Sequence, residues 1–370
     1  MKGTHNDRSC RPHWLALLGR RDMPTDGVED YCDFLARAME PHGVRVEKAR
    51  VEPYEKDWRK TLHGLARRSR DGRCDWVLLQ YTSLGWSWHG FPFFALLAVR
   101  LLKRHGVRVA IVFHEFGRQQ GSRVIDSIRG ACQDWVIRTL YRTSDASIFT
   151  TSLDRVPWLP ANRTKAHYIP IGANIPERTQ ERSMAAQDRN CRTVIVFGIT
   201  GIPQLEKEVQ VIGETLDATA QALGKIRLVV IGRGAAEAAP LLQNRLASSN
   251  VELVDRGILS ADDVADEFAR ADALLFVRGP ITLQRGSMIA GIATGTPIVG
   301  YADNSKIGPL QEAGIGWADR PDAALLARAL IRVLSDSEYW SLLHKRNLEV
   351  QRHYLSWNRI AEQFRSALKS

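Results

Sequence analysis

The sequence predicts an α/β protein of two domains, each built on a parallel sheet with crossover helices. At 370 residues the chain is longer than one hydrophobic core usually serves. In both halves, short apolar runs of strand length alternate with helical patterns. A polar, proline-containing stretch separates the halves. We therefore expect a first domain over residues 1–176, a linker over 177–191 and a second domain over 192–370.

The first half begins this alternation. Its expected strands are residues 14–18, 44–51, 76–81, 107–113, 146–150 and 166–169. Its expected helices are residues 28–39, 58–69, 93–105 and 124–143. Asp26 precedes the first helix and is a candidate N-cap, since its carboxylate can accept from free helix N–H groups. Glu115 is a further candidate for the site beside His114, and the alternative is that it caps the segment that follows it.

The second half repeats the pattern. Its expected strands are residues 193–198, 227–231, 251–254, 273–277 and 296–300, and the chain from residue 323 onward reads as helical. Glycines fall where strands end, at positions 198, 201, 232, 234, 257 and 279. Ligands of open parallel sheets bind outside the carboxyl ends of the strands, so these loops are the place to look for chemistry. The expected architecture is two Rossmann-like domains facing across a cleft, with the C-terminal helices packing back toward the first domain.

Composition narrows the class of protein. Apolar content of 44% and charged content of 25% are typical of a globular chain, and no run approaches the ~20 apolar residues of a membrane span. The first residues lack the apolar region of a signal peptide. The five cysteines are widely spaced and form no C-x-x-C pair, which favours reduced thiols, no metal and a cytoplasmic protein.

The positive charge is unevenly distributed. Residues 1–176 hold 28 Lys and Arg against 18 Asp and Glu, whereas the rest of the chain holds 23 of each. A one-sided positive surface favours an anionic partner, either phospholipid headgroups or nucleic acid, over a merely solvated surface. No nucleic-acid reading motif is present, so we expect no specific nucleic-acid partner.

The segment 278–300 carries the clearest site signal. It reads as a loop, a short helix of small residues, a turn at Gly295 and a buried strand after Pro297. We predict Ser287 as the N-cap of that helix. A helix N-terminus reached through Gly286 offers N–H groups to an anion, and Arg285 adds a planar cation. Phosphate is the expected ligand.

Six short segments, taken in order, carry a resemblance to a known family. They are MPTDGVEDY at 23–31, YIPIGAN at 168–174, FGI at 197–199 followed by Lys207, VIGRG at 230–234, VELVDRG at 251–257 and ARADALLF at 269–276. Over about residues 13–365 the chain resembles the GT-B glycosyltransferases, and most closely glycosyltransferase family four. The resemblance implies a nucleotide-sugar donor held by the second domain and a retaining transfer without metal.

One departure from the family is clear. Family four typically carries two glutamates seven residues apart, which hold the donor ribose and sugar hydroxyls. Thr282 and Ala290 stand at those positions here. Other groups must therefore bind the donor, and the Arg285-Gly-Ser287 sequence is similar to a variant found in some bacterial relatives.

The resemblance and the loop pattern together suggest site residues. The catalytic candidates are His114, Lys207 and Arg285. The donor-binding candidates are Gly27, Gly198, Gly232, Gly234, Arg278, Thr282, Arg285, Gly286 and Ser287. For Lys207 the alternative is an exposed lysine at a helix start, and for His114 it is a strand-end histidine bonded to backbone.

Aromatic and basic residues in the first half suggest how an acceptor is reached. Trp86 and Trp88 open an aromatic segment that ends at Phe94, and five arginines surround residues 124–140. These patterns suit a lipid-linked acceptor at an anionic membrane. The alternatives are that Phe93, Phe94 and Leu97 form the inner face of a helix and that 124–143 is an ordinary half-buried crossover helix.

The function expected from the sequence is a nucleotide-sugar-dependent hexosyltransferase. It would extend a polysaccharide or lipid-linked glycan at the cytosolic face of the membrane. Two alternatives remain, a sugar-nucleotide epimerase and a non-catalytic GT-B module that binds a glycan or a partner transferase.

Overall fold

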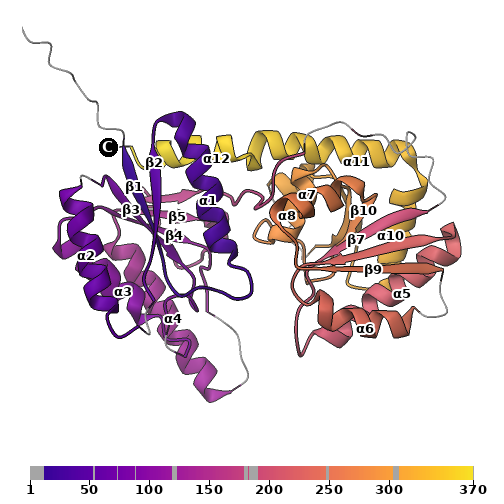
Figure 1. Ribbon diagram of the computed structural model, residues 1–370, viewed down its shortest axis with the longest axis horizontal. Coiled ribbons are helices and arrows are strands. Elements are labelled where there is room, and N and C mark those ends of the chain that lie inside the picture. The colour runs from indigo at the N-terminus through magenta and orange to yellow at the C-terminus, as the bar shows by residue number, and fades with distance from the viewer. Residues whose placement is uncertain are drawn as a thin grey trace, which may run out of the picture. The chain divides into compact units, whose positions relative to one another are not determined.

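The computed structural model divides the chain into two units, residues 1–170 with 360–370 and residues 171–359. It describes residues 12–52, 55–72, 74–87, 89–118, 123–178, 182, 191–246, 250–302 and 308–369. Trp88 and most of the expected linker lie outside these residues. Each unit contains one six-stranded parallel sheet with helices on its faces, which confirms the predicted fold class (Figure 1).

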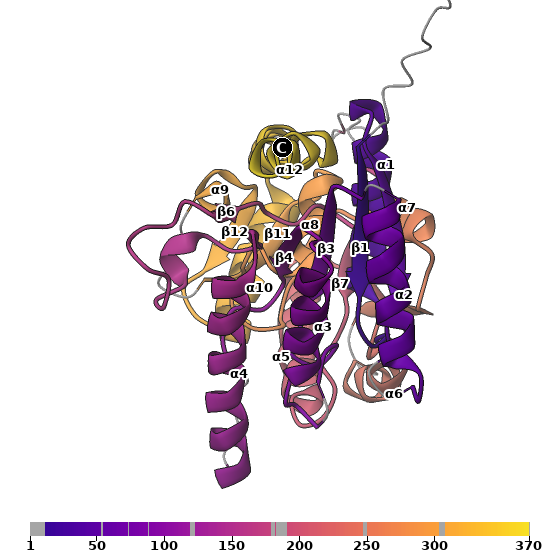
Figure 2. The same cartoon turned by 90° about the vertical axis from the view of Figure 1, so that its left-hand side faces the viewer.

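The first unit has the strand order β2-β1-β3-β4-β5-β6. The strands are β1 (His13–Leu18), β2 (Arg45–Arg50), β3 (Trp76–Tyr81), β4 (Val109–Phe113), β5 (Ala146–Phe149) and β6 (Ala166–Tyr168). The helices between them are α1 (Gly27–Met39), α2 (Trp58–Asp71), α3 (Phe93–Arg104) and α4 (Val124–Thr143). Right-handed crossovers place α1 on one face of the sheet and the other three helices on the opposite face. Figure 2 shows α2, α3 and α4 side by side.

Two aromatic expectations for this unit are wrong. Trp86 is a core residue, 1% exposed, and its indole Nε1 donates to the carbonyl oxygen of Gln80 at 2.7 Å. Of Phe93, Phe94 and Leu97, expected on the inner face of α3, only Phe94 packs against the core, whereas Phe93 and Leu97 are 45% and 40% exposed. The buried face of α3 is formed by Ala95, Leu96, Ala98, Val99 and Leu102.

The second unit has the strand order β12-β11-β10-β7-β8-β9. The strands are β7 (Arg192–Phe197), β8 (Ile226–Ile231), β9 (Val251–Gly257), β10 (Ala273–Leu275), β11 (Ile298–Tyr301) and β12 (Ile315–Ala318). The helices are α5 (Leu205–Leu223), α6 (Ala235–Arg245), α7 (Ala261–Arg270), α8 (Gly286–Ala293), α9 (Pro309–Glu312), α10 (Ala323–Ser335) and α11 (Ser337–Val350). Sequence analysis missed β12, whose four residues include a glycine and carry too little pattern to be recognised.

The last helix, α12 (Trp357–Ala367), links the chain end to the first unit. Its Trp357 indole donates to the carbonyl oxygen of Ala173 in the second unit at 2.7 Å. Farther along, the carbonyl oxygen of Leu368 accepts from the Trp76 indole in the first unit at 3.0 Å. The expected return of the C-terminal helices is therefore confirmed.

Within the described part of the chain, no helix is both long and apolar enough to span a membrane. The cysteines described there, Cys32, Cys74, Cys132 and Cys191, are free thiols, as the sequence predicts.

Candidate functional site

The carboxyl ends of the strands in the second unit gather most of the predicted donor residues. Gly198 follows β7, Gly232 follows β8 and Arg278 lies three residues beyond β10. Because β10, β7 and β8 are neighbours in the sheet, their following loops lie at one edge. This edge brings predicted residues from three separate segments into one region.

Three arginines form the electrostatic centre of this edge. Burial lowers the pKa of Arg278, and the positive charges of Arg285 and Arg233 lower it further, while Glu208 acts in the opposite direction. The Arg278 Nε atom is buried and has no hydrogen-bond partner among the described residues. A buried donor left without an acceptor costs about 1–3 kcal/mol. A cluster of like charges with such a donor fits a diphosphate, which supplies both negative charge and acceptor oxygens.

Gly198 makes room for the Arg278 side chain. Its φ is +75°, and a Cβ atom there would lie 2.8 Å from the Arg278 Nη1. Only glycine combines that backbone conformation with so close an approach. Gly198 therefore positions the guanidinium against the backbone, a role that the sequence did not indicate.

Helix α8 presents its N-terminus at the same edge of the sheet. The predicted N-cap was wrong, because Arg285 is the N-cap and Ser287 is the second helical residue. Arg285 has extended backbone angles, and its carbonyl oxygen accepts from the N–H groups of Met288 and Ile289. Arg285 and Gly286 are exposed, Thr282 is half-buried, and the Ser287 side chain is buried. The free N–H groups at the start of α8 thus directly follow an exposed cation in the chain, and this combination suits an anion.

Gly232 and Gly234 have packing reasons to be glycine. A Cβ at Gly232 would lie 2.8 Å from the Phe197 ring, and one at Gly234 would lie 2.3 Å from the Ile199 carbonyl oxygen. Both have positive φ, and Gly234 is the N-cap of α6. Their contact with a nucleotide stays a prediction.

The described contacts do not join Lys207 to the arginine cluster. It is exposed in the first turn of α5. The next residue, Glu208, is buried, and its Oε2 accepts from the Thr200 N–H at 2.8 Å. Glu208 also interacts electrostatically with Arg278 and with Tyr301, whose pKa is raised first by burial and then by Glu208.

Sequence analysis missed Glu208, Arg233 and Tyr301. A helical signal for Glu208 was available, since it lies one turn before Ile212 on the buried face of α5. Arg233 lies in a turn and Tyr301 is the last residue of a buried strand. Neither position carries a sequence pattern that would predict a binding site.

In the first unit, His114 follows β4 at the carboxyl edge of its sheet. Its Nε2 lies 2.9 Å from Gln80 Oε1, and its ring meets the Tyr31 ring edge-on at 5.1 Å. The Gln80 amide nitrogen points to the Leu78 carbonyl oxygen at 3.4 Å, which leaves Oε1 facing the imidazole. We therefore assign the proton to Nε2, so that Nδ1 keeps its lone pair. Burial lowers the pKa of His114 to about 4, and the charge of Asp26 opposes this only in part.

The two remaining expectations for this edge have different outcomes. Asp26 caps α1 as predicted, accepting from the Val28 and Glu29 N–H groups. It also pairs with Arg50 at 3.0 Å. Gly27 is the exposed first residue of that helix. The Glu115 carboxylate accepts a hydrogen bond from the Ser83 N–H, and its capping of the segment that follows stays a prediction.

The low pKa of His114 predicts a pH dependence of stability. Unfolding restores its ordinary pKa of about 6.5, so the unfolded chain binds more protons between about pH 6.5 and pH 4. This contribution to stability is complete above about pH 6.5 and is lost as pH falls toward 4. We expect His114→Asn to flatten that slope in urea melts, with exposed His353→Gln as the control. An unchanged slope would contradict a buried neutral imidazole.

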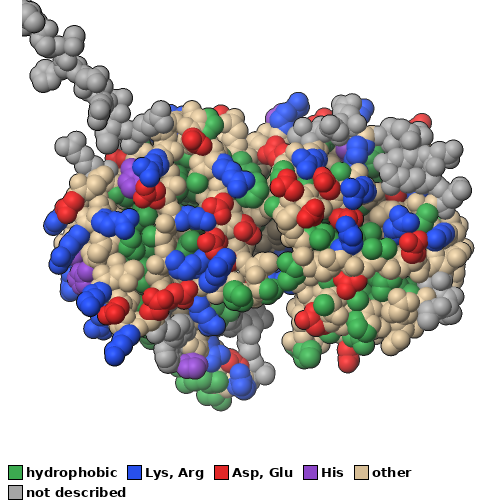
Figure 3. All heavy atoms as spheres, viewed as in Figure 1, with side chains coloured by type: hydrophobic (Ala, Val, Ile, Leu, Met, Phe, Trp, Pro, Cys, Tyr) green, Lys and Arg blue, Asp and Glu red, His purple; other side chains and the backbone are tan. Residues whose placement is uncertain are grey.

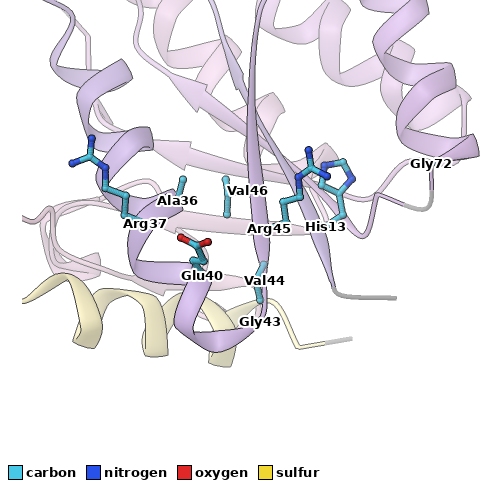
Figure 4. A pocket seen from close by; sticks show the side chains of 9 residues that line it. All are labelled: His13, Ala36, Arg37, Glu40, Gly43, Val44, Arg45, Val46 and Gly72. Atoms are coloured by element: carbon cyan, nitrogen blue, oxygen red, sulfur yellow. The ribbon is translucent and has the colours of Figure 1, made fainter. Parts of the chain in front are cut away.

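A large surface hollow of about 680 Å³ lies elsewhere in the first unit (Figure 4). It is lined by residues at the amino ends of β1 and β2, including His13, Glu40 and Arg45. His114 lies at the opposite ends of the parallel strands. Since ligands of such sheets bind at the carboxyl ends, we do not assign this hollow to the chemistry.

Comparisons with known proteins show the fold. No protein-family model and no curated sequence matches the chain. Anabaena HepE, crystallised with UDP and glucose, is similar with a TM-score of 0.64 and 11% identity, over 96% of this chain and 99% of that one. A Rickettsia africae glycosyltransferase gives 0.66 and 10%, over 98% and 100%. A putative UDP-N-acetylglucosamine 2-epimerase from Listeria monocytogenes gives 0.62 and 12%, over 97% and 96%.

The chain has the two-domain GT-B fold. The predicted fold class is thus confirmed at low sequence identity. Membership of family four and the significance of the replaced glutamates are not settled by these likenesses and stay predictions.

Proposed function

We propose that this GT-B protein is a nucleotide-sugar-dependent glycosyltransferase. The observation that carries the proposal is the cluster of Arg278, Arg285 and Arg233 beside the N-terminus of α8. Fold likeness adds support, since similar structures were solved with UDP or UDP-glucose.

Leaving-group stabilisation is the proposed task of the second unit. When the bond from sugar to phosphate breaks, negative charge grows on the departing diphosphate. Arg278 and Arg285 supply fixed cations, and α8 supplies N–H groups. In this scheme the cations and the N–H groups neutralise the leaving group, so the proposal uses no metal.

His114 is the proposed catalytic group of the first unit. With its proton on Nε2 held by Gln80, the Nδ1 lone pair is able to accept a hydrogen bond from a hydroxyl. Lys207 remains a candidate for the donor phosphate. Thr282 and Ser287 are candidates for hydroxyl contacts to the donor.

The residues and the family resemblance support a more specific proposal about the sugar, the acceptor and the location. We propose transfer of a hexose, with retention, to a polysaccharide or lipid-linked glycan at the cytosolic face of the membrane. The basic balance of the first half of the chain supports an anionic surface as the setting.

Thermal shift against a nucleotide panel tests the proposal. UDP, GDP, ADP and TDP sugars would be compared, because a ligand that binds only the folded state raises the melting temperature. We expect one diphosphate series to raise it and the matching nucleoside monophosphate to have little effect. No shift with any nucleotide, together with no sugar-nucleotide hydrolysis, would count against the proposal.

An epimerase is the second candidate, favoured by the Listeria likeness. Epimerisation requires a base near the sugar, and Glu208, the buried carboxylate at this edge, is bonded to the Thr200 N–H. Incubation with UDP-N-acetylglucosamine and no acceptor separates the two: an epimerase yields an isomeric sugar nucleotide. Donor binding without any turnover would instead indicate the non-catalytic module.

A further inference from the structure

The helices α2, α3 and α4 form the most basic face of the first unit. Together they carry eleven Lys and Arg against three Asp and no Glu, a balance of +8 within a chain whose total is +10. They lie side by side on one face of the sheet (Figure 2). Nearly all of the net positive charge is therefore on one layer.

The outward sides of α3 and α4 are divided between apolar and basic residues. The large apolar residues exposed on these two helices are Val124 81%, Ile125 42%, Ile128 55%, Trp135 50%, Phe93 45% and Leu97 40%. Toward the C-terminal ends the exposed residues include Arg100, Arg104, Arg138 and Arg142. The Phe93 and Trp135 rings lie 6.3 Å apart, which joins the two helices into one apolar surface.

This apolar surface has a fixed position within the unit. The N-terminal ends of both helices follow the carboxyl ends of β3 and β4, the same edge of the sheet as His114. The N-terminal end of α4 extends beyond its neighbours (Figure 2), and hydrophobic side chains are visible there in Figure 3. Exposed Leu84, in the loop after β3, lies at this edge as well.

We propose that this face, formed by α3 and α4 with the basic α2 beside it, docks on an anionic lipid bilayer. The exposed apolar side chains enter the headgroup boundary, and the arginines farther along the same outward sides contact phosphate groups. Large exposed apolar side chains on the same surface as exposed arginines match an anionic bilayer, which offers hydrocarbon and negative charge together. The proposal deepens the proposed function, because it places the His114 edge toward a lipid-linked acceptor.

Nucleic acid fits the observations less well. A backbone of phosphates would account for the arginines but not for the six large apolar side chains of α3 and α4 that are at 40% exposure or more. In a symmetric dimer through this face, the two helix layers would each carry a charge of +8 and would repel one another. Both are tested as separate outcomes below.

Vesicle co-sedimentation of the full chain tests the docking surface. Vesicles of phosphatidylcholine alone are compared with vesicles that also contain phosphatidylglycerol. We expect binding to the anionic vesicles, weakened at least tenfold by Val124→Ser with Ile128→Ser. A similar loss is expected for the charge variant, in which Arg100, Arg104, Arg138 and Arg142 are changed to Gln.

Matched controls lie in the second unit. They are Ile258→Ser with Leu342→Ser for exposed apolar residues, and Arg328, Lys345, Arg346 and Arg352 changed to Gln for charge. Both controls should bind vesicles as the unmodified protein does. Loss of binding in the controls, or no loss in the docking variants, would overturn the proposal.

Two further measurements keep the result separate from donor binding. The nucleotide-induced thermal shift should be the same in all variants, so that a failure of the glycosyltransferase proposal does not affect this test. Sedimentation velocity and random-sequence duplex DNA binding address the other partners. A dimer that Val124→Ser with Ile128→Ser dissociates, or DNA binding without vesicle binding, would overturn the membrane assignment.

Discussion

Replacing Arg278 by Ala is expected to weaken binding of the preferred nucleotide diphosphate about 100-fold, since two charge-assisted hydrogen bonds contribute about 1.5–3 kcal/mol each. The same change should leave the melting temperature of the free protein unchanged or slightly higher. Arg278 stands among like charges, which lower its pKa together with burial, and its Nε lacks a partner among the described residues. The side chain therefore contributes little to folding.

This pairing of effects separates a binding role from a structural one. Removal of an arginine with a structural role lowers the stability of the fold. Removal of a ligand-binding arginine that lies among other positive charges does not. Isothermal titration with UDP and a thermal melt without ligand give the two quantities. Exposed Arg328→Ala is the control for a general loss of positive charge. A marked fall in melting temperature with unchanged affinity would contradict the assignment of Arg278 to the donor.

Replacing Gly234 by Ala is expected to destabilise the second unit by about 3–5 kcal/mol, the range of severe steric changes. Its φ is +76°, and the new Cβ would lie 2.3 Å from the Ile199 carbonyl oxygen. That carbonyl belongs to backbone, which cannot turn aside as a flexible side chain does. For a unit of this size we expect a fall of about 10 °C in the melting temperature.

Gly286→Ala is the matched control for this prediction. Gly286 is the first residue of α8, and a Cβ there meets nothing within 4 Å. Stability should be kept or raised slightly, since Ala is preferred to Gly in helices. A melting temperature of the Gly234 variant equal to that of the Gly286 variant would show that the turn tolerates a side chain.

Much of the architecture was predictable because it depends on local sequence patterns, namely hydrophobic periodicity and turn residues. Buried parallel strands are continuous apolar runs, and 76–81 and 124–143 agree with β3 and α4 at both ends. The glycines after the strands were also recognisable, since turns with positive φ favour that residue. Asp26 caps α1 because an Asp directly before an amphipathic run is a local signal.

The errors share a different cause. Ser287 and Arg285 are both plausible residues at a helix start, and the backbone angles set by packing of α8 decided between them. Trp86 was expected to be available to a lipid-linked acceptor, but it is buried in the core and its indole donates to the Gln80 carbonyl oxygen. Glu115 bonds to Ser83, which is 32 residues away in the chain, a contact that was not predicted. None of these contacts is visible in a sequence window.

The sequence by itself determined the two parallel-sheet units and the edges of the sheets at which ligands are expected, because periodicity and turn residues act over a few neighbours. The tertiary structure alone decided which side chains meet there. Arg278 and Arg285 come from the loop between β10 and α8, Arg233 comes from the turn after β8, and Glu208 comes from helix α5. Their proximity depends on strand order, and strand order is set by the packing of whole elements.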